Sequence, residues 1–167
     1  MVKDWHAAVD GILQRDSGKS AAFVMDKGEH ALRIRGWLGL NAKQSIDVQY
    51  FIWSTDNVGR LALAGLLQAA HRGVQVRILV DDLMLEKPYE LLLAMDAHPK
   101  IEIRVYNANN TLGVGFWKRI WTALTNFRNL NQRMHQKTFI VDKRAAVVCG
   151  RNMAEEYYDF DPEFNLL

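Results

Sequence analysis

Apolar residues recur along this chain at two spacings, every three to four residues in some stretches and every second residue in others. Helical spacing or a run of good helix formers covers four segments, 5–13, 29–44, 59–72 and 88–98. Alternation typical of strands covers three more, 45–53, 74–82 and 101–107. Because strands that alternate with helices usually join into crossover units, the pattern predicts an α/β fold with a mixed, largely parallel sheet. We expect helices on both faces of that sheet and the strand after His135 near its centre.

A further amphipathic segment, 116–128, has two interpretations. Its aromatic and aliphatic residues fall on one helical face, and basic and polar residues fall on the other. The first interpretation is a helix that packs on the sheet. The second is a contact with a lipid interface, where Trp combined with Lys or Arg is common. The residues that would make this membrane contact are Phe116, Trp117, Ile120 and Trp121.

Size and charge narrow the class of protein. With 167 residues, 49% of them hydrophobic, the chain suits one domain, which we place at 29–167 after a lead-in segment at 1–28. The net charge of +2 gives no general basic character, which argues against a nucleic-acid partner. No apolar run approaches the ~18 residues of a spanning helix. A membrane role would therefore be peripheral.

Polar residues interrupt the apolar stretch 133–152, and they suggest chemistry on a phosphate. On an extended strand His135 and Lys137 project from the same face. A lysine supplies a fixed positive charge for a phosphate oxygen, and a histidine serves as nucleophile or general acid near neutral pH. Asn152 follows closely enough to donate a further hydrogen bond. This set requires no metal or other cofactor. The alternative is an ordinary surface pair at a strand entrance.

The spacing His-x-Lys-x-x-x-x-Asp at 135–142, followed by "CGRN" ending at Asn152, resembles the signature of the phospholipase D superfamily. The surrounding sequence is similar to the bacterial cardiolipin synthase branch, although that branch usually has Gly at the position of Cys149. The resemblance implies that His135 attacks phosphorus to give a phosphohistidine, with Lys137 and Asn152 as phosphate ligands. Asp142 completes the motif, and because it faces away from His135 on the predicted strand we give it a supporting role in the catalytic set, buttressing the hairpin.

Three further positions keep two interpretations each. Arg151 binds a phosphate or pairs with Glu155 one helical turn later. Asp81 ends a predicted strand, where functional residues of parallel sheets gather, but a helix cap or turn is the simpler role. Cys149 is small, like the glycine it replaces, so a tight turn survives there, although a left-handed backbone would be strained.

The chain carries one copy of the motif, whereas the resemblance implies a second histidine that protonates the leaving alcohol. Either two identical chains pool their histidines about a two-fold axis, or the chain is the first half of a duplicated enzyme. We favour the second, and expect little transferase activity from the chain alone.

The expected function is phosphatidyl transfer between phospholipids, such as phosphatidylglycerol, at the cytoplasmic face of the bacterial inner membrane. The alternatives are a homodimeric phosphodiesterase or nuclease and a non-catalytic phospholipid-binding module.

Overall fold

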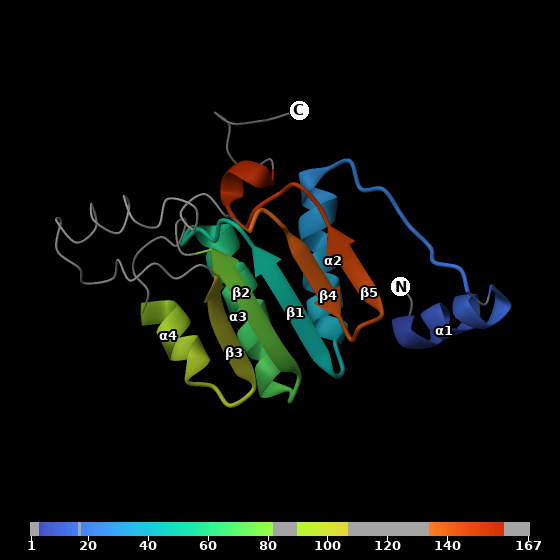
Figure 1. Cartoon of the computed structure of the whole chain (residues 1–167), viewed down its shortest axis with the longest axis horizontal. Helices are drawn as coiled ribbons and strands as arrows, with labels where there is room; N and C mark the ends of the chain where they lie inside the picture. Colours follow the sequence, from blue (N-terminus) through green and yellow to red (C-terminus); the bar gives the residue numbers. More distant parts are fainter. Residues whose placement is uncertain (1–3, 17, 82–89, 107–133, 159–167) are drawn as a thin grey trace, which may run out of the picture.

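The computed structural model describes residues 4–16, 18–81, 90–106 and 134–158. Its helices are α1 (Trp5–Arg15), α2 (Gly28–Asn41), α3 (Asn57–His71), α4 (Glu90–Asp96) and the short 3-10 helix η2 (Glu155–Tyr157). Its strands are β1 (Ser45–Tyr50), β2 (Gln75–Asp81), β3 (Ile101–Tyr106), β4 (Thr138–Val141) and β5 (Ala145–Val148). The strands form one sheet in the order β3-β2-β1-β4-β5 (Figure 1).

The sheet is mixed, as the sequence predicts. Strands β1, β2 and β3 run parallel, while β4 and β5 form an antiparallel hairpin that adds to the other edge of β1. Val48 of β1 lies opposite Ile78 on one side and Phe139 on the other. The strand that follows His135 is therefore an interior strand, between β1 and β5. The α/β fold is confirmed.

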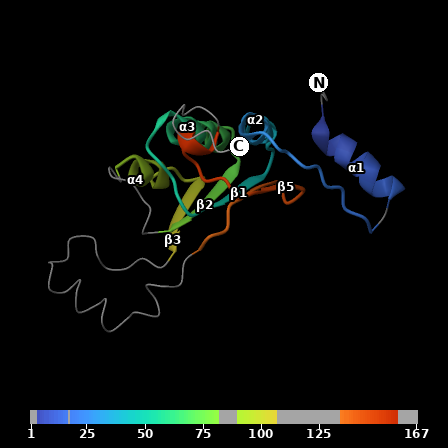
Figure 2. The same cartoon turned by 90° about the horizontal axis from the view of Figure 1, so that it is seen from above.

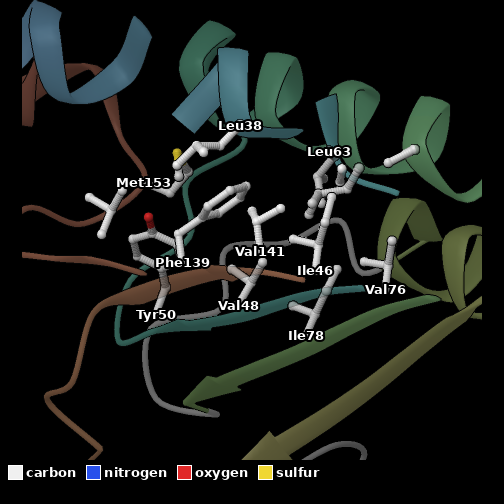
Figure 3. Close-up of a cluster of buried hydrophobic side chains, with 14 of the residues drawn as sticks. Leu38, Ile46, Val48, Tyr50, Leu63, Val76, Ile78, Phe139, Val141 and Met153 are labelled. Carbon is white, nitrogen blue, oxygen red and sulfur yellow. The ribbon is translucent and has the colours of Figure 1, made fainter. Parts of the chain in front are cut away.

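The hydrophobic core lies between one face of this sheet and the helices. Every second residue of β1 is buried, and the same alternation continues across β2 and β4. Figure 3 shows Val48, Tyr50 and Phe139 projecting from the sheet toward α2 and α3. Burial of this alternating set supplies most of the driving force for folding.

In the part of the chain that the structure describes, α2, α3 and α4 all lie on this same face (Figure 2). The opposite face carries polar residues, including the ion pair between Asp47 and Arg77. The expected helices on a second face are thus not seen among these residues. The alternation of apolar and polar residues in the strands already indicated that one face of the sheet is not covered by helices. Strands that are covered on both faces have continuous apolar runs instead.

Helix α1 is joined to the end of α2 and to the hairpin β4–β5 by specific contacts. The buried Trp5 donates its indole N–H to the Asn41 carbonyl at 3.2 Å, and Arg144 donates to Asp10 at 2.6 Å. Asp4 caps the helix by accepting from the His6 and Ala7 amides. The predicted lead-in therefore packs against the domain at the turn between β4 and β5 (Figure 1).

The loop after β1 is fixed by a close backbone approach at Gly59. Asp56 caps α3 by accepting from the Gly59 amide at 2.8 Å, and the Trp53 indole donates to the Gly59 carbonyl at 3.2 Å. A Cβ atom at Gly59 would lie 1.8 Å from the Ser54 carbonyl oxygen, so no other residue fits. The loop 51–56 is thereby held against the start of α3, next to the predicted phosphate ligands. Helix α3 ends, as predicted, at a glycine with positive φ, Gly73.

Candidate active site

The structure places His135, Lys137 and Asn152 at the carboxyl end of β1. Thr138, the first residue of β4, pairs with Gln49 near the end of β1, so His135 and Lys137 lie just beyond that end. Strand β5 returns antiparallel to β4 and leads to Asn152, and a bridge between Trp53 and Met153 brings the two loops together. Loops at the carboxyl ends of parallel strands are the usual location of ligand sites in such sheets.

His135 and Lys137 both lie against the ring of Phe51. The His135 and Phe51 ring centroids are 5.2 Å apart, and the Lys137 Nζ atom lies 5.6 Å from the Phe51 centroid. The Lys137 ammonium donates to the His135 carbonyl at 2.8 Å. His135 is exposed while Lys137 is only 2% exposed. The pair combines an accessible imidazole with a buried cation.

Burial lowers the pKa of Lys137, and the neighbouring Cys149 partly opposes that effect. Lys137 has no carboxylate partner among the described residues, and a buried ammonium in this condition reduces stability. The predicted role of Lys137 in binding an anion stays a prediction.

Replacement of Lys137 by methionine should leave the free energy of unfolding unchanged or raise it by ~1 kcal/mol at neutral pH. The gain should vanish as pH rises through the lowered pKa of Lys137, because the lysine then becomes neutral. Urea unfolding from pH 7 to pH 10 measures both effects, with the exposed Lys100→Met as the matched control. A marked loss of stability in Lys137→Met would show that the ammonium supports the fold.

Asn152 is 3% exposed and held by the loop after β1. Its Oδ1 atom accepts from the Ile52 amide at 3.2 Å, which leaves the amide hydrogens as its remaining polar function. Burial raises the pKa of Tyr157, and a hydrogen bond with the Asn152 side chain opposes that rise. Tyr157 therefore lies close to this amide.

Asp81 connects β2 to the residue before the predicted nucleophile. It is fully buried at the end of β2, and its Oδ2 atom accepts from the Met134 amide at 3.2 Å. The sequence indicated a functional position for Asp81 only through its location at the carboxyl end of a predicted parallel strand. Asp81 therefore anchors the segment that carries His135, while its neighbour Asp82 lies outside the described residues.

Asp142 lies at the opposite end of β4 from His135. Its carboxylate accepts from the Lys43, Gln44 and Ser45 amides at 2.7–2.9 Å and contacts His6 Nε2 at 2.6 Å. Burial alone would raise the pKa of Asp142, but the three amides and the His6 ring outweigh it and lower the pKa. The carboxylate ties β4 to the start of β1 rather than reaching a bound phosphate, in keeping with the supporting role expected from the strand geometry.

Arg151 does not pair with Glu155. Its guanidinium donates to the Tyr157 carbonyl at 2.9 Å and to the Asp26 carbonyl at 3.2 Å. Glu155 instead accepts from the Asn57 amide. These two bonds leave three of the five guanidinium N–H donors, so phosphate binding by Arg151 stays a prediction.

Cys149 replaces glycine without backbone strain, because the non-glycine residues with positive φ in the described chain are Asp142 and Lys143. The Cys149 amide donates to the Lys137 carbonyl at 3.3 Å, and its sulfur accepts from Arg35 at 2.7 Å. The side chain therefore lies between Lys137 and a buried guanidinium.

The membrane-contact residues Phe116, Trp117, Ile120 and Trp121 lie outside the described part of the chain. Within the described ranges, no three His, Cys, Asp or Glu side chains cluster as metal ligands would. None of the helices described is long and apolar enough to cross a bilayer.

Residues 40–167 match the family described as "Cardiolipin synthase, PLD-like domain". The chain belongs to this family of phospholipase D-like domains. Cardiolipin synthase C of Escherichia coli (strain K12) is 37% identical over 155 residues, covering 91% of this chain and 31% of the relative. The major cardiolipin synthase of Bacillus subtilis (strain 168) is 32% identical over 123 residues, covering 74% of this chain and 23% of the relative. The chain thus spans a third or less of these relatives' length.

Solved structures show the same fold. NucT from Helicobacter pylori superposes with a TM-score of 0.60 at 15% identity, covering 86% of this chain and 80% of that one. Nuc from Salmonella typhimurium, a phospholipase D family member, superposes with a TM-score of 0.51 at 18% identity, covering 77% and 68%. At these identities the likeness is one of fold. The resemblance to the phospholipase D superfamily that the motif indicated is confirmed.

Proposed function

We propose that this chain provides the nucleophile half of a phosphatidyl-transfer site of the cardiolipin synthase type. The observation that carries the proposal is the position of an exposed His135 and a buried Lys137 against one aromatic ring, where Lys137 has no carboxylate partner among the described residues. Such a pair suits an anion that approaches from solvent and is neutralised at the protein surface. Membership of the cardiolipin synthase family supports a phospholipid as the source of that anion.

The reaction proceeds in two displacements at phosphorus. In the first, the His135 imidazole forms an N–P bond while the P–O bond to the departing alcohol breaks, and that oxygen takes up a proton. In the second, the hydroxyl of an acceptor lipid loses its proton and attacks phosphorus, and the N–P bond breaks. Lys137 and Asn152 stabilise the charge on the non-bridging oxygens in both steps.

The proton for the departing alcohol comes from a second motif, supplied by a further half of the protein or by a second copy of the chain. Among the described residues, His6 is committed to Asp142 at the far end of β4. His30 lies on α2, and His71 and His98 contact each other. None of these belongs to the group around His135. The donor is phosphatidylglycerol or a similar phospholipid, and the protein works peripherally at the cytoplasmic face of the membrane.

Incubation with phosphatidylglycerol vesicles labelled at phosphate tests this proposal. We expect the chain alone to acquire label in an acid-labile, base-stable adduct, as a phosphoramidate does, with little cardiolipin formed. Addition of a protein half that carries the second motif should raise turnover. Robust cardiolipin synthesis by the monomeric chain would contradict the half-site.

The same samples separate the alternatives. A homodimeric nuclease would sediment as a dimer and cleave DNA. A binding module would retain phospholipid headgroups without any adduct, and His135→Ala would leave that retention unchanged.

A further inference from the structure

An apolar groove lies between α2 and α3, separate from the residues around His135. It encloses about 290 Å³, and its inner wall consists of Trp53, Phe139 and Met153. Figure 3 shows the Phe139 ring pointing from β4 toward the two helices. A methylene group is close to a water molecule in size, ~30 Å³, so the groove suits a chain of about ten carbons.

Glycines keep this groove open. Gly36 on α2 and Gly65 on α3 line it, and a Cβ atom at either position would meet nothing within 4 Å. Close packing of the two helices therefore does not require these glycines. A glycine inside a helix costs stability relative to alanine. Their presence on both walls is explained if the space between them is used.

A buried cation that has no acidic partner in the part of the chain the structure describes lines the same groove. Arg35 is 3% exposed and lines the groove, and its Nε atom has no hydrogen-bond partner. The other guanidinium nitrogens donate to the Ala31 carbonyl and to the Cys149 sulfur. The groups that raise the pKa of Arg35 against burial are two tyrosines and Cys149, with no carboxylate among them. A buried charge in this condition favours an anionic ligand.

The rim is apolar as well. Leu40 and Leu61 line the groove and remain 61% and 64% exposed. Large exposed apolar side chains around an apolar opening are typical of a site for a hydrophobic ligand.

We propose that the α2–α3 groove binds the alkyl chain of an anionic single-chain amphiphile, with the anionic head at Arg35 and the chain directed toward the leucine rim. A carboxylate head or a phosphate monoester head would satisfy the same cation. His135, Lys137 and Asn152 are not among the residues that line this groove, so the groove is an additional lipid site. It does not depend on transfer through His135.

Titration with decanoate and with decyl phosphate, each below its micelle concentration, tests this site. The methyl resonance of Met153, observed after methionine methyl labelling, reports occupation of the groove. We expect that resonance to shift with both anions and to shift at least tenfold more weakly with decyltrimethylammonium. The affinity ratio of decanoate to decyl phosphate identifies the head group that the site prefers.

Variants complete the test. The double variant Gly36→Leu/Gly65→Leu fills the groove and should weaken decanoate binding at least tenfold, and Gly65→Leu alone provides a milder version. Gly11→Leu on α1, where a Cβ atom also meets nothing within 4 Å, is the matched control and should bind normally. Arg35→Gln should remove the preference for anions.

His135→Ala should bind decanoate like the unaltered chain, so failure of phosphatidyl transfer leaves this result intact. An unmoved Met153 resonance in the unaltered chain, or full affinity in a folded groove-filled variant, would overturn the proposal.

Discussion

Replacement of His135 by alanine is expected to abolish the phosphate adduct and to lower any phosphatidyl transfer by at least ~10³-fold. The imidazole is the nucleophile in the proposed reaction, and the buried Lys137 cannot replace it, because its ammonium donates to the His135 carbonyl. Labelling of the chain by phosphate-labelled phosphatidylglycerol measures the adduct. Transfer is measured in the presence of the second motif.

This loss should not come from unfolding. His135 is exposed, so the free energy of unfolding should change by no more than about 0.5 kcal/mol. His30→Ala, which removes another exposed histidine from α2, is the matched control and should keep full labelling. Labelling that persists in His135→Ala would place the nucleophile elsewhere and would contradict the proposed site.

The local pattern of the chain was sufficient to predict most of its elements. The alternation at Ile46, Val48 and Tyr50 predicted which face of β1 is buried, and the helix that ends at Gly73 was also foreseen. The parallel order of β1, β2 and β3 followed from the strand–helix alternation. These features depend on spacings within a few residues, where period and capping are visible in the sequence.

Contacts between distant segments could not be predicted in this way. His6 and Asp142 are 136 positions apart, and neither residue has a local pattern that indicates the other. The same holds for Arg151, whose partners are backbone carbonyls that every residue possesses. Asp142 is a partial exception, because the two-residue period of a strand predicted that its side chain points away from His135. Nothing in the sequence indicated the three amides that donate to its carboxylate.

Those amides make Asp142 a residue whose replacement should cost considerable stability. Asp142→Asn is expected to lower the free energy of unfolding by ~3 kcal/mol at pH 7. An asparagine retains one acceptor oxygen, so its NH₂ group must face either the Lys43 amide or the Gln44 and Ser45 amides, donor against donor. Because these bonds fix β4 on β1, the loss should also loosen the segment that carries Lys137. Urea unfolding measures the effect, and Asp10→Asn, which breaks only the exposed pair with Arg144, should cost less than about 1 kcal/mol.

The pH dependence distinguishes the charge from the shape of this side chain. Since the pKa of Asp142 is lowered in the folded chain, its ionised form contributes stability above the ordinary aspartate range, and that contribution disappears as pH falls through the lowered pKa. The difference in unfolding free energy between the unaltered chain and Asp142→Asn should therefore be full at pH 7 and shrink below about pH 4. A difference that stays constant from pH 7 to pH 2 would mean that packing, rather than the carboxylate charge on three amides, holds the hairpin to β1.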